Sequence, residues 1–225
     1  MNGDLNRLMA RLGYQFQDIS LLELALTHRS VSRHRNYERL EFLGDAQLGQ
    51  IISVALFEQF PEAAEGQLTR MRASLVRGQT LALVARELGL GEYLVLGGGE
   101  LKSGGFRRDS ILADALESII GAMLLDGGES RCREVVLCWF APRLDAISPQ
   151  SAQKDAKTRL QEWSQGLVLG IPTYELVERS GPDHQPQFKV RVSVDGYSPA
   201  EAEASSKRAA EKEAACLFIK TNNIE

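Results

Sequence analysis

The feature that most constrains this chain is an apolar stretch that carries three carboxylates. Residues 37–48 read YERLEFLGDAQL, and helical spacing places Glu38, Glu41 and Asp45 on one face. A helix this apolar is normally buried, and buried carboxylates are costly unless they are paired, hydrogen-bonded or bound to a metal. The stretch therefore predicts a metal site, or else a cluster in which Arg39 and nearby bases pair with the acids. The apolar side chains spread around the same helix are Leu40, Phe42, Leu43, Leu48, Ile51 and Ile52.

A second apolar helix, predicted over 110–125, repeats this pattern. Its only charged residues are Asp114 and Glu117, at positions i and i+3, and it has no lysine or arginine to compensate them. We expect the two helices to pack together so that both groups of acids face one hard cation. Mg²⁺ suits such a site because it binds carboxylate and water oxygens in octahedral geometry.

Length and composition set wider limits. The chain has 225 residues, of which 44% are hydrophobic and 25% charged, as in a soluble globular protein of one or two domains. No apolar run approaches the ~18 residues of a membrane span, and residues 1–7 lack the layout of a signal peptide. Cys132, Cys138 and Cys216 have no metal-ligand spacing, so we expect reduced, buried thiols and a cytoplasmic protein.

The first 147 residues are predicted to be helical almost throughout. The glycine-rich stretch 97–108 does not follow a strand at phosphate-loop spacing, so we expect a flexible basic loop or a plain surface loop. His28 is expected to be a hydrogen-bonded structural residue and not a metal ligand. Further helices are predicted over 3–13, 18–27, 37–59, from Gly66 onward, and over 80–88 and 129–147.

The pattern changes after residues 148–153, which read as a small polar linker. Residues 154–225 carry ten Lys/Arg and eleven Asp/Glu, so a site for a polyanion must come from the placement of charges. The expected order is α-β-β-β-α, a small α+β domain. Its parts are a helix over 157–165, strands over 173–179, 187–194 and near 199–204, and a helix over 206–220.

These segments together resemble ribonuclease III, the endonuclease specific for double-stranded RNA. Residues 38–45 (ERLEFLGD) resemble the family signature, and residues 26–30, 100–108 and 114–117 fall where the family has matching segments. Residues 157–162 (KTRLQE) and 205–208 (SSKR) resemble parts of a double-stranded-RNA-binding domain. The resemblance implies an all-α endonuclease domain over 1–147, a linker over 148–153 and a small α+β (α-β-β-β-α) RNA-binding domain over 154–225.

The resemblance also implies a reaction. The family hydrolyses RNA phosphodiesters to 5′-phosphate and 3′-hydroxyl ends with short 3′ overhangs, and it processes ribosomal and messenger RNA precursors. It acts in the cytoplasm as a homodimer with Mg²⁺, for which Mn²⁺ can substitute, and without a membrane or a small-molecule cofactor. The implied catalytic residues are Glu41, Asp45, Asp114 and Glu117. Metal ligation is assigned to Glu41, Asp114 and Glu117, a water-mediated or basic role to Asp45, secondary roles to Glu38 and Glu65, and a dimer contact to Phe42.

Binding of duplex RNA is expected to follow shape, 2′-hydroxyls and phosphates. The implied RNA-binding residues are Thr158, Gln161, Glu162, His184, Ser206, Lys207, Arg208 and Lys212. Without the resemblance, Gln161 and Glu162 would be read as an exposed helix face, and Lys207 and Arg208 as solubilising charge. The family often has Gly-x-Gly where this chain has Ala202-Glu203-Ala204, and many such domains have a lysine where Glu211 stands. Both departures bear on RNA affinity and not on the fold.

Two other functions would fit parts of the chain. A protein that binds structured RNA without cutting it would have no reason to keep four carboxylates in apolar helices. A helical phosphohydrolase for small phosphates would leave the C-terminal α-β-β-β-α domain idle. Both alternatives therefore explain less of the chain than a double-stranded-RNA endonuclease does.

Overall fold

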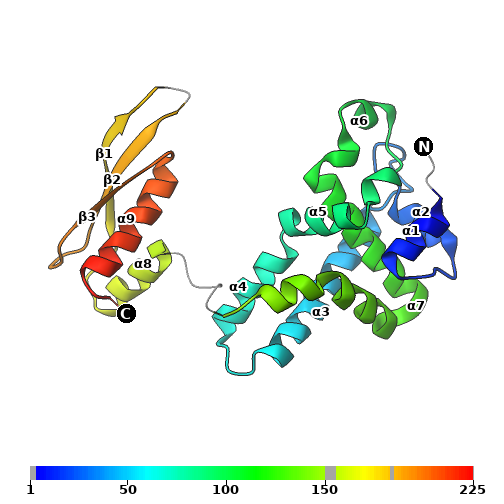
Figure 1. Cartoon of the computed structure of the whole chain (residues 1–225), viewed down its shortest axis with the longest axis horizontal. Helices are drawn as coiled ribbons and strands as arrows, with labels where there is room; N and C mark the ends of the chain where they lie inside the picture. Colours follow the sequence, from blue (N-terminus) through cyan, green and yellow to red (C-terminus); the bar gives the residue numbers. More distant parts are fainter. Residues whose placement is uncertain (1–3, 150–155, 183–184, 225) are drawn as a thin grey trace. The chain divides into compact units, whose positions relative to one another are not determined.

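The chain divides into two compact units, residues 1–152 and 153–225, each with its own apolar core (Figure 1). The structure is a computed structural model, and it describes residues 4–149, 156–182 and 185–224. The all-α and α-β-β-β-α order expected from the sequence is confirmed for these residues. The boundaries of the linker over 148–153 remain a prediction, because residues 150–153 lie outside the described part.

The N-terminal unit is built from helices around a long central pair. α1 begins after Asp4, whose side chain accepts a hydrogen bond from the Asn6 amide at 2.9 Å, and it ends at Gly13, whose φ of 71° suits glycine. The elements are α1 (Leu5–Leu12), α2 (Ile19–Ala25), α3 (Glu38–Gln59), α4 (Glu65–Val76), α5 (Gly78–Glu87), η1 (Leu90–Glu92), α6 (Gly98–Lys102), η2 (Gly105–Arg107) and α7 (Asp109–Ala146).

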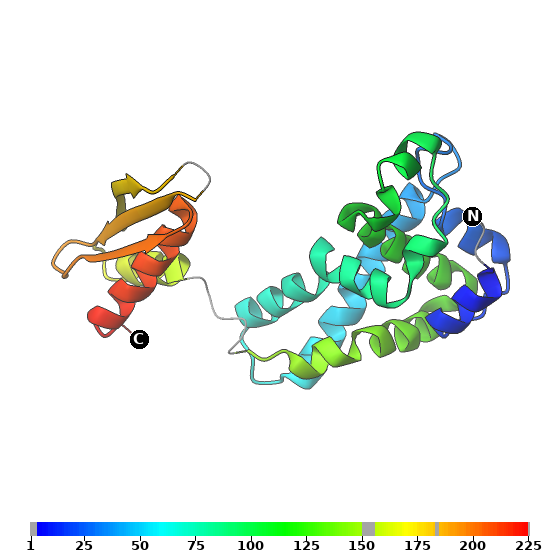
Figure 2. The same ribbon diagram turned by 45° about the horizontal axis from the view of Figure 1, so that its top comes forward.

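Two glycines let α3 and α7 cross with their backbones in contact. A Cβ atom added to Gly44 would lie 1.7 Å from the carbonyl oxygen of Glu117, and one added to Gly121 would lie 2.2 Å from that of Leu40. No other residue type fits at either position without moving a backbone. Figure 2 shows the two helices at the centre of the unit. This crossing brings the acidic stretch of α3 beside the acids of α7.

The element α7 consists of two helical parts that meet at Gly128, whose φ of 77° and ψ of 176° are not helical, in agreement with the separate helices predicted over 110–125 and 129–147. Just before the kink, Asp126 accepts hydrogen bonds from the Tyr14 hydroxyl at 2.9 Å and from the Asp18 amide at 2.8 Å. Burial acts to raise the pKa of Asp126, but these hydrogen bonds and one from Gln17 hold it below its ordinary value. Asp126 thus ties the segment between α1 and α2 to the bend of α7.

The expectation of a flexible loop over 97–108 is wrong. The stretch forms the short helix α6 and the turn η2, and the Gly97 amide donates to the Ser30 hydroxyl at 2.9 Å. Arg108 and Glu100 form an ion pair at 3.0 Å across the stretch. Gly97 is needed here because a Cβ would lie 2.5 Å from the carbonyl oxygen of Ser30, and a Cβ at Gly105 would lie 2.9 Å from that of Glu100. A Cβ at Gly98, Gly99 or Gly104 would meet nothing within 4 Å, so close packing explains two of these five glycines.

The C-terminal unit is a three-stranded antiparallel sheet with both helices on one face (Figures 1 and 2). Its core joins Leu160 of α8, Val192 of β2 and Phe218 of α9. The strands pair in the order β1-β2-β3, with a bulge in β1 between Leu176 and Glu178. The elements are α8 (Ala156–Gly166), β1 (Thr173–Ser180), β2 (Gln187–Ser193), β3 (Ala200–Ala204) and α9 (Lys207–Thr221).

Two further expectations need correction: that all three thiols are buried, and that the acidic helix is buried. Ala202 and Ala204 lie in β3, within the strand predicted near 199–204, paired with Val190 and Phe188. Strand backbone needs no glycine, so the absence of Gly-x-Gly puts no strain on this position. Of the three cysteines only Cys132 is buried, while Cys138 is exposed and Cys216 half-buried. The acidic helix α3 is not buried all round, because Phe42 and Phe57 are 80% and 70% exposed.

Within the described residues, α3 is the one helix long and apolar enough to cross a membrane by length and composition. It also carries Glu38, Glu41 and Asp45, it packs against α7, and its Leu48 and Ile52 are fully buried. α3 is therefore a core helix of the N-terminal unit and not a membrane span.

Candidate metal centre and charged surfaces

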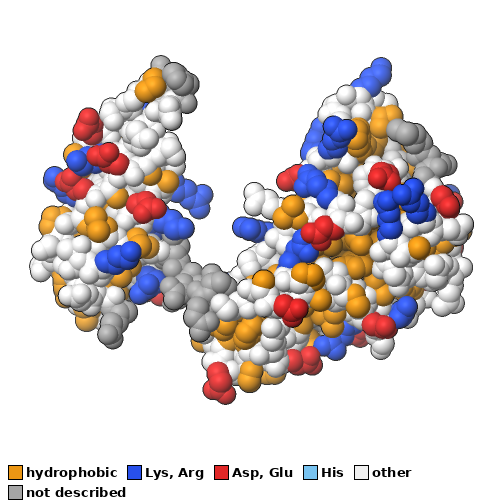
Figure 3. Space-filling model, viewed as in Figure 1, with side chains coloured by type: hydrophobic (Ala, Val, Ile, Leu, Met, Phe, Trp, Pro, Cys, Tyr) orange, Lys and Arg blue, Asp and Glu red, His pale blue; other side chains and the backbone are white. Residues whose placement is uncertain are grey.

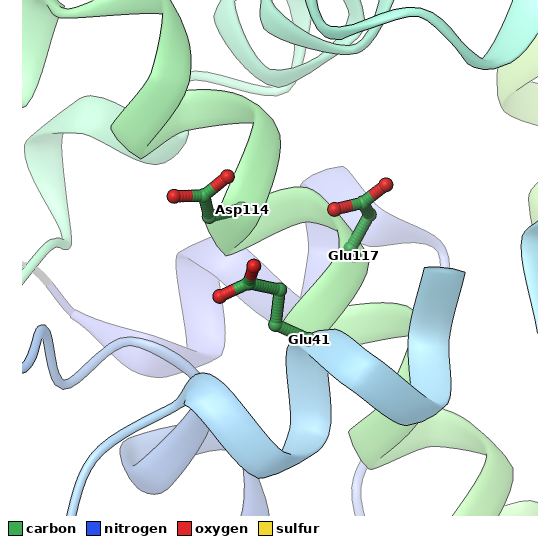
Figure 4. Close-up of side chains that lie close together, drawn as sticks. All are labelled: Glu41, Asp114 and Glu117. Carbon is green, nitrogen blue, oxygen red and sulfur yellow. The ribbon is translucent and has the colours of Figure 1, made fainter. Parts of the chain in front are cut away.

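Three of the predicted acids converge at the crossing of α3 and α7. One oxygen of each of Glu41, Asp114 and Glu117 lies within 4.8 Å of the other two, and all three side chains are half-buried. Figure 4 shows the carboxyl groups of Asp114 and Glu117 on α7 gathered beside that of Glu41 on α3. The sequence expectation that the two helices bring their acids together is met by this geometry.

Of the three acids, Glu117 is the one whose charged form is least favoured by its surroundings. Burial, followed by the charges of Asp45, Asp114 and Glu41, raises the pKa of Glu117 to about 8. Burial also raises the pKa of Glu41, and the nearby Asp114 adds to the effect. In the described part of the chain no ion pair joins Glu41, Asp114 or Glu117 to a base. Of the bases near the signature, Arg29 pairs with Glu38 at 3.5 Å and acts to lower the pKa of Glu41, so the acid–base alternative describes only the edge of the site.

Asp114 is held in a different environment from Glu117. Burial raises its pKa, and the Tyr37 hydroxyl, followed by His28 and Arg29, opposes that shift. Tyr37 and His28 are both buried, and their rings meet edge to face at 5.5 Å between centroids. The groups that lower the pKa of Asp114 are thus a hydroxyl and two bases, whereas the charged groups that act on Glu117 are other carboxylates.

The donor set fits a hard divalent cation. Carboxylate oxygens are the ligands that Mg²⁺, Ca²⁺ and Mn²⁺ prefer, and a cation among these three groups would remove the repulsion that raises their pKa values. Half-burial leaves one side of the cluster open to solvent, as a substrate would require.

The remaining predicted acids lie outside this group of three. Asp45 is exposed and lies one helical turn after Glu41. Its charge is one of the causes that raise the pKa of Glu117. Glu38 is exposed and forms an ion pair with Arg29 at 3.5 Å. Glu65 lies in the first turn of α4, where it accepts a hydrogen bond from the Thr69 hydroxyl at 2.7 Å.

Sequence reasoning missed several residues that support the cluster. Gly44 lies inside the quoted signature, but its role as a contact between helices depends on Gly121, which is distant in sequence. His28 is a hydrogen-bonded structural residue as expected, and its Nδ1 atom accepts from the Ser30 hydroxyl at 2.7 Å. Tyr37 precedes the signature and gave no signal, because one tyrosine before a helix has many ordinary explanations.

The predicted RNA-binding residues of the C-terminal unit lie on its two helices. Thr158, Gln161 and Glu162 are exposed on α8, and the basic residues Lys207, Arg208 and Lys212 are exposed near the start of α9. Ser206 caps α9, since its hydroxyl accepts from the Ala209 amide at 3.2 Å. His184 lies outside the described residues.

Glu211 points toward α8 and not into solvent. Its carboxylate pairs with the Lys157 ammonium group at 2.7 Å, and its side chain is only 17% exposed. The same ammonium group lies 4.4 Å from the centre of the Tyr174 ring. Glu211 therefore pairs with a lysine of its own unit and links α9 to α8, while its effect on RNA affinity stays a prediction.

The N-terminal unit exposes large apolar side chains. Phe42 and Phe57 on α3, Leu83 on α5 and Leu125 on α7 are all more than half exposed. On the face drawn in Figure 3, hydrophobic side chains gather over the lower part of the unit, and basic side chains gather toward α6. Exposed aromatic residues of this size are typical of a protein–protein interface.

Comparisons with known proteins agree with both units. A family model described as ribonuclease-III-like matches residues 18–144, and one described as double-stranded RNA binding motif matches residues 156–221. The chain is 81% identical to the ribonuclease 3 of Alcanivorax borkumensis over 220 residues, 97% of this chain and 96% of that protein. It is 56% identical to the ribonuclease 3 of Hahella chejuensis over 216 residues, 96% and 95% of the two chains.

Solved structures give the same result for the N-terminal unit. The nuclease domain of ribonuclease III from Campylobacter jejuni superposes with a TM-score of 0.62 and 39% identity, covering 64% of this chain and 99% of that one. A second structure of that domain, described by flexibility in a region involved in dimer formation, gives a TM-score of 0.61 with 40% identity, covering 62% and 97%.

Fold, carboxylates and RNA-binding motif together define an endoribonuclease that acts on double-stranded RNA. Within that class, the chain belongs to the ribonuclease III family. The resemblance read from the sequence is thereby confirmed.

Proposed function

We propose that this endoribonuclease works as a homodimer with Mg²⁺, and that Glu41, Asp114 and Glu117 hold the ion while Asp45 assists. The single observation that supports these assignments is the convergence of the three carboxylates within 4.8 Å on two apolar helices. The products are 5′-phosphate and 3′-hydroxyl ends with short 3′ overhangs, as in the family.

Each acid has a distinct task in this proposal. A bound cation lowers the pKa of water and neutralises charge that develops on the phosphate. Glu41 and Asp114 supply oxygens from facing helices, and Glu117 is the residue most closely tied to the chemistry because its charge is the least compensated. Asp45, which is exposed at the edge of the cluster, accepts the proton of the attacking water. Glu38 and Glu65 serve in the placement of substrate.

The dimer is supported by the exposed apolar residues of α3. Phe42 lies next to Glu41 in sequence and is 80% exposed, so packing it into a partner would bury an aromatic ring beside each cluster. A two-fold axis would then place two clusters symmetrically, one for each strand of a duplex. The Campylobacter jejuni neighbour is itself described by a region involved in dimer formation.

RNA binding is assigned to the exposed faces of α8 and α9. Thr158, Gln161 and Glu162 would contact one minor groove, and His184 the next. Lys207, Arg208 and Lys212, with Ser206 at the N-terminus of α9, would bind the phosphates between them, where the helix dipole also favours anions. The substrates are ribosomal and messenger RNA precursors in the cytoplasm.

The test is cleavage of an RNA hairpin labelled in turn at each end, followed on a denaturing gel. With Mg²⁺ or Mn²⁺ we expect cuts on both strands offset by a short overhang, and with EDTA none. Glu117→Gln should abolish cleavage and leave RNA binding intact, because the substitution keeps the size of the side chain but removes its charge. A hairpin that is bound but never cut with either ion would favour an RNA-binding protein without nuclease activity.

A further inference from the structure

One face of the C-terminal sheet is not covered by the helices, and it carries a regular pattern of charge. Successive side chains of a strand point to opposite faces of its sheet. Val190 and Val192 of β2 are fully buried on the side of the helices. Lys189 and Arg191 therefore point to the opposite side, the outer face of the sheet. Because the strand order is β1-β2-β3, these two bases lie on the central strand.

Each base of β2 stands between two acids of the neighbouring strands. The register gives two rows across the sheet, Glu178–Lys189–Glu203 and Glu175–Arg191–Glu201. Cross-strand neighbours lie on the same face and are close enough for their side chains to interact. The two rows thus hold four carboxylates and two cations, so the charge of the outer face along them is negative.

Both bases of the outer face form ion pairs with the acids of β3. The Arg191 guanidinium group lies 2.6 Å from a carboxylate oxygen of Glu201, and its Nε atom donates to the same oxygen at 2.7 Å. The Lys189 ammonium group lies 3.5 Å from Glu201 and 3.6 Å from Glu203. The hydrogen bond from Arg191 lowers the pKa of Glu201, so this carboxylate stays charged at neutral pH. The acids of β3 therefore neutralise both cations of the outer face.

The bases that are proposed to contact RNA are placed differently. Lys207 and Arg208, at the start of α9, form no ion pair with any residue that the structure describes. A base that is already paired gains little from a phosphate, because the displaced carboxylate binds a cation of its own and cancels the release of counterions. The acids of β1 add repulsion of phosphates on the outer face. Unpaired cations are thus offered beside the helices and paired ones on the outer face.

We propose that Glu201 and Glu203 are specificity-determining residues, which mask the two bases of β2 so that duplex RNA is bound on the helical side of the unit and not on the outer face. The inference rests on the proposed RNA-binding role of α8 and α9. Residues 154–225 carry ten Lys/Arg and eleven Asp/Glu, so only part of their surface can attract a polyanion. The ion pairs between β2 and β3 select which part that is.

The test compares two double variants of the full chain that remove the same charge from the same face. Glu201→Gln with Glu203→Gln frees both bases. We expect its affinity for a duplex RNA in EDTA to rise about tenfold at about 0.1 M salt, with a slope of log affinity against log salt that is steeper by about 1–2. Glu175→Gln with Glu178→Gln is the matched control, since neither acid is joined to a base in the described part of the chain. It should leave the slope unchanged.

A third variant checks that the freed bases cause the gain. Lys189→Gln and Arg191→Gln, added to the Glu201→Gln and Glu203→Gln chain, should return affinity and slope to those of the wild type. Exposed ion pairs contribute little to stability, so all three variants should fold, which circular dichroism verifies. No gain in the first double variant, or an equal gain in the control, would overturn the proposal.

Binding and cleavage together separate a failure of this inference from a failure of the proposed function. In a chain that also carries Lys207→Ala and Arg208→Ala, freeing the bases of β2 should restore RNA binding without restoring cleavage, because the RNA then lies on the outer face. If Lys207→Ala with Arg208→Ala alone binds RNA as the wild type does, the proposed RNA-binding face is wrong and the inference falls with it. If that face is confirmed and the freed bases restore no binding, the masking is overturned. Cleavage that returns together with binding would overturn the orienting role.

Discussion

Glu117 is half-buried beside three other carboxylates, an arrangement that opposes folding whenever no cation is present. Natural chains keep such a group where function requires it, because a neutral residue of equal size would be more stable there. The stability of the metal-free protein should therefore depend on whether Glu117 is charged.

We expect metal-free stability to depend on pH through Glu117. Its pKa is about 8 in the folded chain against an ordinary value of 4.5, so the folded state holds the proton more tightly than the unfolded state. The contribution is fully present below about pH 4.5 and is lost as the pH rises to about 8. In EDTA, the melting temperature of the wild type should fall across this window relative to that of Glu117→Gln. Parallel curves for the two proteins would mean that Glu117 is not strained by its neighbours.

At the scale of elements, the geometry of the site depends on how closely two helices approach. Gly44→Ala places a methyl group against the carbonyl oxygen of Glu117, so α3 and α7 must separate. We expect a loss of about 3 kcal/mol in unfolding free energy, with weaker Mg²⁺ binding. Gly49→Ala, on the same helix with nothing within 4 Å of the added Cβ, should instead gain about 0.5–1 kcal/mol. Urea unfolding compares the two, and equal effects would refute the close approach.

A second contact between elements joins α8 to α9. Glu211→Lys would set two ammonium groups together at Lys157, and we expect a loss of about 1–3 kcal/mol in the stability of the C-terminal unit. Glu213→Lys, an exposed position on α9, makes the same change in net charge and should alter stability by less than about 0.5 kcal/mol. Urea unfolding of residues 154–225, followed by Trp163 fluorescence, measures both. Equal stabilities of the Glu211→Lys and Glu213→Lys variants would mean that the contact of Glu211 with Lys157 does not stabilise the unit.

The sequence predicted what local spacing encodes. Acids at i and i+3 on apolar helices were recognisable, because few structures tolerate them without a cation, and the strand alternation of 187–194 was equally clear. The pairing of Gly44 with Gly121 and of Glu211 with Lys157 was not predictable, since each joins residues that only the tertiary fold brings together. The helix over 98–102 was missed because glycine usually marks flexible backbone.

For the whole molecule, separate cores allow each unit to be tested alone. Residues 1–147, which include all of α7, should form a dimer and cut duplex RNA weakly, best at low salt, since the phosphate contacts of the C-terminal unit are lost. Sedimentation measures the assembly, and Phe42→Ser should shift it toward monomer by removing an exposed aromatic ring. A monomeric fragment would contradict the proposed interface.

RNA affinity of the full chain depends on where its charges lie, because the net charge is −4. Replacing Lys207 and Arg208 by alanine removes two proposed phosphate contacts. We expect weaker binding to duplexes of any sequence, and a slope of log affinity against log salt that is shallower by about 1–2. Lys220→Ala, at the far end of α9, should leave the slope unchanged. If the slope of the double variant is unaltered, Lys207 and Arg208 do not contact phosphates and provide only solubilising charge.

The backbone contact between α3 and α7 also affects the size of ion that the acidic cluster can hold. Metal–oxygen distances are about 2.1 Å for Mg²⁺ and about 2.4 Å for Ca²⁺. Because the backbones of α3 and α7 are in contact at Gly44 and Gly121, the distance between the two helices is fixed by packing. A larger ion must then be accommodated by rotation of the carboxylates alone. If the ion is Mg²⁺, as proposed, peptide groups that never contact it would limit the size of the ion, and widening the crossing by a methyl group would shift the preference of the cluster toward calcium.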